Sequence, residues 1–300
     1  MKSYGFGIIG LGVMGQEMAE NLNGHPRFHV VAGFDPARPN VPFPLLADAA
    51  AVVNDPRVEA IYTATPPAFH EAVVRLAVAA GKPLLCEKPL AHTIPSARDC
   101  CDLIATSKLP AAVNFSYAAR DVATRLTHVV KSGAIGTVEG VHLHVRFGSW
   151  PRKWQSGAGA WLAQPAEGGF TREVISHFVF LANRLFGAGK ITARSIERGS
   201  AGTETKLTAT IQYPSVAFTI DAGIGGDRDD DNRFAVKGAK GEVAIVDWSQ
   251  FDYAGDAAIS LPPTSQLDAL ADMLDGKPHQ LATFPEGLAV AELIEALLAD

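Results

Sequence analysis

The stretch Tyr4–Gly15, with the sequence YGFGIIGLGVMG, decides the fold of the first half of the chain. It opens with a short apolar run rich in β-forming residues. Gly10, Gly12 and Gly15 follow in the spacing G-x-G-x-x-G. The residues VMGQEMAENL then have the apolar spacing of an amphipathic helix. A strand that enters a helix through such a loop is typical of a dinucleotide-binding unit.

Each glycine of this loop meets a separate physical demand. Gly10 permits a tight turn, Gly12 lets the backbone approach a pyrophosphate, and Gly15 lets the helix pack closely on the strand. The first helical residues, Val13 and Met14, offer N–H groups and the positive end of the helix dipole to the phosphates. The loop therefore predicts a dinucleotide cofactor.

The next apolar segment, FHVVAGFD, bears on the choice of cofactor. It ends in Asp35, about 20 residues after Gly15, the spacing expected for a carboxylate that bonds the adenosine ribose. This charge would repel a 2′-phosphate, so NAD is predicted. Arg38 could bind that phosphate, which leaves NADP as the alternative.

Composition excludes several classes of partner. The formal net charge is −6 and the pI is near 5.8, which gives no electrostatic footprint for nucleic acid or an anionic membrane. Three cysteines without paired spacing argue against a disulfide framework and against a metal site. The first strand starts at Tyr4, which leaves no room for a signal peptide, and no apolar run approaches membrane-spanning length. We expect a cytoplasmic protein with a small-molecule substrate.

The first half alternates strand and helix patterns. Apolar strands are predicted over 4–9, 28–35, 58–63, 83–86 and 111–115, and helices follow the glycine loop and cover 48–53, 70–80 and 96–106. This alternation predicts an α/β Rossmann-type doubly wound parallel sheet. We place this dinucleotide-binding domain at 1–116.

The pattern changes after Asn114. A helix over 122–131 is followed by the alternating segment TVEGVHLHVRF and by a long loop over 149–169. After a helix over 170–185, five strand segments lie within 191–248, and helices over 265–274 and 286–298 close the chain. We therefore expect an α+β domain at 117–300 with a large, mostly antiparallel open sheet, used for substrate binding and oligomerisation.

Six segments of the chain resemble the Gfo/Idh/MocA oxidoreductases, the family of glucose-fructose oxidoreductase and inositol 2-dehydrogenase. The most specific are AAGKPLLCEKPLA at 79–91, around Glu87, Lys88 and Pro89, and GGFTREVISH at 168–177, around His177. The others are GLGVMG at 10–15, ATPPAFH at 64–70, VNFSYAAR at 113–120 and SGAIGTVEGVHLH at 132–144. The resemblance covers nearly the whole chain.

The resemblance implies roles for individual residues. Lys88 would be the active-site lysine, beside the nicotinamide ribose and the substrate, with a cis Lys88–Pro89 peptide bond. The residues implied or predicted to bind the cofactor are Gly10, Gly12, Val13, Met14, Gly15, Asp35, Arg38, Thr65, Pro66, His70, Glu87 and Lys88. Asn114, Arg120 and Trp154 are substrate-binding candidates from their placement.

The family's substrate helix usually reads D-x-G-x-H, and this chain has EVISH. Glu173 and His177 therefore stand at the catalytic positions, four residues apart on one face of a predicted helix. Ile175 replaces a glycine, which predicts a smaller or more apolar pocket.

The activity implied is NAD(P)-dependent hydride transfer at a hydroxyl or carbonyl carbon of a sugar, polyol or cyclic diol. His177 would take the hydroxyl proton, Lys88 would polarise the oxygen, and Glu173 would bind or orient a polar group. The alternating strands suggest a homodimer or homotetramer, as in relatives.

Two alternatives remain open from the sequence. The opening GLGVMGQEMAENL also resembles the β-hydroxyacid dehydrogenases, but the strand-rich second half opposes that class. A non-catalytic dinucleotide-binding sensor of the same fold is suggested by Glu173 and Ile175. The intact Lys88 and His177 count against it.

Overall fold

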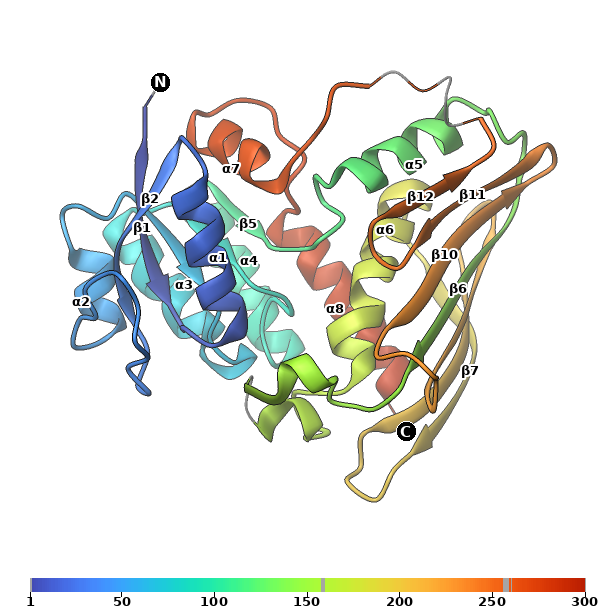
Figure 1. The fold of residues 1–300 in the computed structure, drawn as a ribbon, viewed down its shortest axis with the longest axis horizontal. Helices are drawn as coiled ribbons and strands as arrows, with labels where there is room; N and C mark the ends of the chain where they lie inside the picture. The colour runs from blue at the N-terminus through green and yellow to red at the C-terminus, as the bar shows by residue number, and fades with distance from the viewer. Residues whose placement is uncertain (1, 158–159, 256–258, 260, 300) are drawn as a thin grey trace. The chain divides into compact units, whose positions relative to one another are not determined.

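The computed structural model describes residues 2–157, 160–255, 259 and 261–299, and it divides the chain into two compact units (Figure 1). Unit 1 contains Met1–Phe115 and Gln266–Ala289. Unit 2 contains Ser116–Ser265 and Val290–Asp300.

Unit 1 is built on a five-stranded sheet in which every neighbouring pair is parallel. Its spatial order is β2-β1-β3-β4-β5. The strands are β1 (Tyr4–Ile9), β2 (Phe28–Phe34), β3 (Ala60–Thr63), β4 (Leu84–Cys86) and β5 (Ala111–Val113). The predicted doubly wound parallel sheet is thus confirmed. The chain order reverses between β1 and β3, and ligands of such sheets bind at the carboxyl ends of the strands there.

The helices of unit 1 follow the predicted pattern closely. They are α1 (Val13–Gly24), α2 (Ala49–Asn54), α3 (His70–Ala80), α4 (Ile94–Ser107) and α7 (Gln266–Leu274), and the one-turn 3₁₀ helix Pro67–Phe69 precedes α3. Gly81 ends α3 with a φ of 65°. Helix α4 begins two residues earlier than predicted because the Thr93 side chain caps it, accepting from the Ser96 N–H.

The predicted single span 117–300 for the second domain is wrong, because residues 266–289 belong to unit 1. The Val113 N–H donates to the Ala282 carbonyl at 2.8 Å, which attaches this segment beside β5. Gly287 packs so closely on Val113 that a Cβ would lie 3.0 Å from its side chain. Helical periodicity shows that a segment is amphipathic but not which sheet it covers.

Unit 2 is built on a seven-stranded sheet in the order β12-β11-β10-β6-β9-β8-β7. Its pairs are antiparallel except for the parallel pair β6 and β9, which confirms the mostly antiparallel sheet. The strands are β6 (Val138–Phe147), β7 (Lys190–Arg198), β8 (Glu204–Gln212), β9 (Ala217–Ile224), β10 (Asp231–Gly238), β11 (Gly241–Val246) and β12 (Gln250–Tyr253). Strand β12 was not predicted, since it has only four residues.

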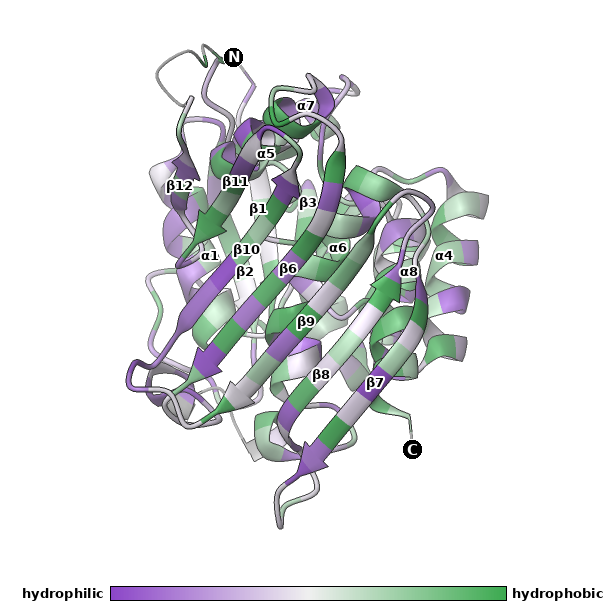
Figure 2. Cartoon of the chain, turned by 90° about the vertical axis from the view of Figure 1, so that its right-hand side faces the viewer, coloured by the Kyte–Doolittle hydropathy of each residue, from purple (hydrophilic) through white to green (hydrophobic). Residues whose placement is uncertain are grey.

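The two faces of this sheet differ in character. The helices α5 (Asp121–Lys131) and α6 (Ser176–Phe186) lie in unit 2, and α8 (Phe284–Leu298) begins in unit 1 and ends in unit 2. Helix α6 packs on the sheet, with the Phe178 and Phe234 rings stacked at 5.8 Å. On β6, His142 and His144 are exposed between buried apolar neighbours. Figure 2 shows this alternation along β6, β9 and β10.

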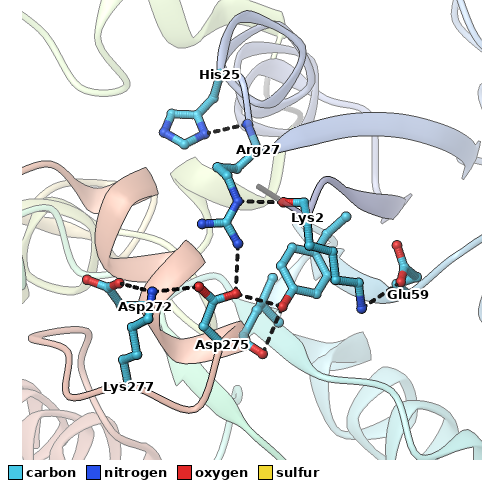
Figure 3. A network of polar contacts seen from close by, with 9 residues as sticks. Lys2, His25, Arg27, Glu59, Asp272, Asp275 and Lys277 are labelled. Carbon is cyan, nitrogen blue, oxygen red and sulfur yellow. Dashed lines mark hydrogen bonds and ion pairs between the residues drawn. The ribbon is translucent and has the colours of Figure 1, made fainter.

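A carboxylate at the end of α7 connects this helix to β1 within unit 1 (Figure 3). Asp275 accepts hydrogen bonds from Arg27 at 2.7 Å, from the Tyr4 hydroxyl at 2.9 Å and from Lys277 at 2.8 Å. These bonds, that of Arg27 foremost, hold the pKa of the Asp275 carboxyl well below its usual value.

We therefore predict that Asp275→Asn lowers the stability of the protein at neutral pH. Because the folded-state pKa is depressed, the stabilisation is complete above the unfolded value of about 4 and is lost as the pH falls through the folded-state pKa. Urea unfolding midpoints should separate the variant from the parent at pH 7 and converge at acid pH. Asp272→Asn, which loses only a 3.7 Å pair with Lys277, is the control. Equal midpoints at pH 7 would contradict the prediction.

Candidate active site

The glycine loop of unit 1 is fixed by packing at two of its three glycines. Gly10 has a φ of 89°, and a Cβ there would lie 2.5 Å from the Ala64 backbone. A Cβ on Gly15 would lie 2.0 Å from the Gly10 carbonyl oxygen. These two positions therefore tolerate no side chain.

Gly12 differs from its neighbours. Apart from its chain neighbours and its own helix, none of the described residues has an atom within 4 Å of the position that its Cβ would take, so the space beside the helix start is open. Gly12 is the N-cap of α1, and the N–H groups of Val13 and Met14 in the first turn have no partner within an α-helix. An open space beside such donors fits a pyrophosphate.

Asp35 follows β2, and its carboxylate is oriented by the backbone. The Leu11 N–H donates to Oδ2 and the Ala37 N–H donates to Oδ1, both at 2.8 Å. Each oxygen keeps a second lone pair, so the carboxylate can still accept hydrogen bonds from the two hydroxyl groups of a ribose. Arg38 instead donates to the carbonyls of Leu45 and Leu46, at 3.2 and 3.3 Å.

His70, which was expected to contact the cofactor, is hydrogen-bonded within unit 1. Its side chain is completely buried, with Nε2 at 2.8 Å from the Thr65 carbonyl and Nδ1 at 2.9 Å from the Pro89 carbonyl. Burial lowers the pKa of His70, although the two carbonyls favour the charged ring. Both nitrogens face the chain, so His70 ties the turn containing Thr65 and Pro66 to the segment after β4. It offers no polar atom to a cofactor.

Glu87 is hydrogen-bonded within unit 1, and its predicted contact with the cofactor stays a prediction. Its Oε1 accepts from the Tyr62 hydroxyl and from the Asn114 amide, both at 2.6 Å. Its Oε2 accepts from the Lys88 N–H at 3.2 Å. Burial raises the pKa of Glu87, and the bonds from Tyr62 and Asn114 oppose that rise.

Asn114 was expected to bind substrate, but both ends of its amide are engaged. Its nitrogen donates to Glu87, and its oxygen accepts from Gln266 at 3.0 Å. The chain Gln266–Asn114–Glu87–Tyr62 thus connects α7, β5, β4 and β3. Sequence reasoning missed Tyr62 and Gln266, because strand and helix periodicity does not reveal side-chain partners.

The backbone of Lys88, at the carboxyl end of β4, is bound to this network through Glu87. The Lys88–Pro89 peptide bond is cis, as the family resemblance implied. The side chain is partly exposed. Gly12, Asp35 and Lys88 therefore all lie at the carboxyl ends of unit 1 strands.

In unit 2, the segment with Glu173 begins as a π-helical turn (Thr171–Ile175), where an α-helix was expected. The Thr171 N–H donates to the buried Glu204 carboxylate at 2.6 Å. Gly169 has a φ of 97°, and a Cβ there would lie 2.4 Å from Glu204. These contacts explain Gly169, and a Cβ on Gly168 would lie 2.2 Å from the Leu162 carbonyl oxygen. π turns often mark functional sites.

His177 follows this turn in the first turn of α6. It is 6% exposed, and its Nδ1 accepts from the Ser116 N–H at 3.2 Å. Glu173 is partly exposed, whereas Ile175 has no exposed surface. Ser116 was missed because a backbone donor has no signature in a sequence.

Trp248 is a second residue that the sequence did not reveal. Its ring meets that of His177 at 5.6 Å and 82°, and it stacks on Tyr117 at 6.0 Å. Its Nε1–H donates to Asp230 at 2.8 Å, and its backbone N–H donates to Asn232 at 3.1 Å. Trp248 has a φ of 68°, which is uncommon for a residue with a side chain. It was predicted only as the end of a strand.

The Tyr117 hydroxyl is buried and finds no hydrogen-bond partner among the described residues. Such an atom usually bonds to water or to a ligand. Burial raises the pKa of Tyr117 above its ordinary value.

The remaining substrate candidates lie in different surroundings. Arg120 is exposed at the N-cap of α5. Trp154 is 50% exposed, and the Arg152 guanidinium lies 4.6 Å from its ring centroid. A substrate role for either stays a prediction.

Within the described ranges, no group of three or more histidine, cysteine or acidic side chains could hold a metal ion. The three cysteines are free thiols. None of the described helices combines the length and apolar character needed to cross a bilayer.

Comparison with known proteins finds a matching family model for each unit. Residues 4–115 match the model of the oxidoreductase family with an NAD-binding Rossmann fold, and residues 123–244 match the GFO/IDH/MocA C-terminal domain. Inositol 2-dehydrogenase 1 of Saccharopolyspora erythraea is 36% identical over 109 residues, 33% of this chain and 32% of that protein. The chain thus matches about a third of the length of that curated relative.

Solved structures share the fold over almost the whole chain. A myo-inositol dehydrogenase of Corynebacterium glutamicum has a TM-score of 0.79 at 19% identity, covering 99% of this chain and 96% of that one. The WlbA dehydrogenase of Bordetella pertussis, in complex with NADH and UDP-GlcNAcA, has a TM-score of 0.81 at 16% identity, covering 99% and 94%. Together with the family matches, these findings show that the chain belongs to the GFO/IDH/MocA family of oxidoreductases, with an NAD-binding Rossmann domain at its amino-terminal end.

Proposed function

We propose that this protein is an NAD-dependent dehydrogenase that acts on a CH–OH group of a small polar substrate, of the sugar, polyol or cyclic diol type. The relatives named above are dehydrogenases of inositol or are bound to a nucleotide sugar. Inositol and the sugar part of that ligand both carry hydroxyl groups, which supports this substrate class.

The residues of unit 1 fit NAD. The open space beside Gly12 would receive the pyrophosphate, and the Asp35 carboxylate would accept from the adenosine ribose. Arg38 is bound to its own loop, which favours NAD over NADP. When bound, NAD supplies the hydride acceptor.

One observation carries the proposed chemistry: the Glu87 network holds the Lys88 backbone at the carboxyl end of β4. A buried carboxylate is costly unless it is fully hydrogen-bonded, so its presence here indicates that the position of Lys88 matters. We propose that Lys88 polarises the reacting oxygen, that His177 hydrogen-bonds this oxygen, and that Glu173 orients a second polar group. Arg120 and Trp154 would contact other parts of the substrate.

We also propose a cytoplasmic homodimer or homotetramer. The outer face of the unit 2 sheet carries His142, His144, Asp221 and Arg233 in a shallow depression between β6, β9 and β10. A second copy could cover this polar face across a two-fold axis.

We predict that Gly12→Ala weakens NAD binding but leaves the fold intact. The new methyl group enters open space, and an N-cap change from glycine to alanine costs at most about 1 kcal/mol. It would occupy the room of the pyrophosphate, so the Kd for NAD should rise at least about tenfold, or about 1.4 kcal/mol. Calorimetric titration measures this, with Gly24→Ala as the control, since its Cβ also meets nothing within 4 Å. An unchanged Kd would place the pyrophosphate elsewhere.

We predict that His177→Ala lowers kcat by about 10² to 10⁴ on the best substrate of a panel of polyols, sugars and cyclic diols. NADH formation measures the rate, with NADP in parallel to compare the cofactors. His29→Ala changes an exposed histidine of unit 1 and should leave the rate unchanged. If NAD binds and no panel compound reacts, the chain is a sensor and the proposed activity is wrong.

A further inference from the structure

Glu173 lies in a turn whose geometry is uncommon in proteins. Within this turn the Ser176 N–H donates to the Thr171 carbonyl, five residues earlier, whereas an α-helix pairs residues four apart. π turns are rare, so the helical preference of the residues does not by itself account for this one. Contacts from other segments are needed to hold the turn, and Arg172, its second residue, makes several of them.

The side chain of Arg172 joins the turn to two other segments of unit 2. The residue is 9% exposed, and its Nη1 donates to the carbonyls of Pro165 and Gly168, at 2.8 and 2.9 Å. Its Nε and Nη2 donate to the two carboxylate oxygens of Glu295 in α8, at 2.6 and 2.8 Å. Four of the five N–H donors of the guanidinium are thus bound, which the single ammonium of a lysine could not reproduce.

Both of these segments are held by contacts of their own. A Cβ on Gly168 would lie 2.2 Å from the Leu162 carbonyl oxygen, so the chain before the turn is closely packed. At the end of α8, Arg198 donates to the Leu298 carbonyl at 2.6 Å, where the helix dipole favours a cation. The π turn is therefore bound to a loop and to a helix that other residues fix in place.

The backbone of Arg172 is held as well. Its carbonyl accepts from the buried Ser176 hydroxyl at 2.6 Å. A serine that bonds the carbonyl four residues earlier often bends a helix, which fits the irregular turn. Glu173 follows Arg172 directly, and His177 follows Ser176 directly. Because the bond joins the residues before Glu173 and His177, it bears on the spacing of these two side chains.

We propose that Arg172 is a positioning residue, which maintains the π turn and thereby sets the place of the Glu173 carboxylate in the proposed active site. This inference rests on the proposed dehydrogenase function and specifies what positions one residue in it. Arg172 acts through its bonds to the chain and needs no contact with the substrate. Glu295 acts through Arg172, because a buried guanidinium without its carboxylate is poorly compensated.

Substrate discrimination separates this positioning role from a purely structural one. Glu173 is proposed to orient a second polar group, so a substrate analogue without that hydroxyl group should lose less once Glu173 is displaced. The measured quantity is kcat/KM for the best substrate of the panel divided by kcat/KM for this analogue. The ratio does not depend on how much of the enzyme is folded, since both compounds react with the same folded fraction.

We expect Arg172→Met and Glu173→Ala each to lower this ratio by at least about tenfold. The double variant should lose no more than the larger of the two single losses, because both changes remove the same interaction. Arg57→Met removes an exposed pair with Asp55 in unit 1 and should leave the ratio unchanged. An unchanged ratio in Arg172→Met, or losses that multiply in the double variant, would overturn the proposal.

Glu295→Gln tests the same contact with a smaller change, so the proposal stays testable if Arg172→Met does not fold. It keeps the shape of the carboxylate and removes its charge, and it should lower the ratio in the same direction. Hydrogen exchange of the protein without substrate gives a readout that does not depend on turnover. The amides of residues 171–177 should exchange faster in Glu295→Gln than in the parent, and those of β1 should not change.

Equal exchange over residues 171–177 in Glu295→Gln and the parent would overturn the role of Arg172 and Glu295 in holding the turn. If these amides exchange faster and no panel compound reacts, the proposed activity fails and the contact that maintains the turn stands. The two failures are thus distinguished by one pair of measurements.

Discussion

The buried carboxylate of Glu87 is the constraint on which the amino-terminal half of the site depends. It lies where β3, β4 and β5 end, and its partners Tyr62 and Asn114 come from the strands on either side. Each hydrogen bond to a charged group contributes about 1.5 to 3 kcal/mol, and losing one partner leaves the carboxylate poorly solvated. The strand ends are therefore tied to one another, and the backbone of Lys88 is tied to them.

Unit 2 uses a different device to fix its reactive side chain. His177 follows a π turn, and the N–H at the start of that turn donates to the buried carboxylate of Glu204. Its imidazole is then fixed by one backbone donor and by an indole whose residue has a φ of 68°. Left-handed backbone costs such a residue roughly 1–2 kcal/mol, which the bonds of Trp248 to Asp230 and Asn232 offset. Strain of this kind is maintained where the surroundings fix the conformation.

The sequence predicted what depends on local pattern. The glycine spacing, the carboxylate of Asp35 and the alternation of strand and helix reflect short-range rules, and these predicted the parallel sheet of unit 1 and its class as an NAD-binding domain. The antiparallel sheet of unit 2 followed from period-two alternation. What the sequence did not reveal depends on contacts between distant segments. Asn114 bonds Glu87 and Gln266, the latter about 150 residues away, and no local pattern indicates these partners. Ser116 contributes only its backbone, and no side-chain pattern can reveal a backbone donor.

The two departures from the family pattern in EVISH, Ile175 and Glu173, have different physical consequences. From the sequence, Ile175 suggested a smaller or more apolar pocket, and it was one reason to consider a non-catalytic sensor. However, this side chain has no exposed surface, so it takes no accessible room from a ligand. Glu173 keeps the carboxylate that the family places there and adds one methylene. It is partly exposed at the π turn, where helical geometry is wider than in an α-helix. The longer side chain of Glu173 changes how far its carboxylate extends, but the group keeps the same chemistry. This favours an enzyme with an altered substrate over a sensor.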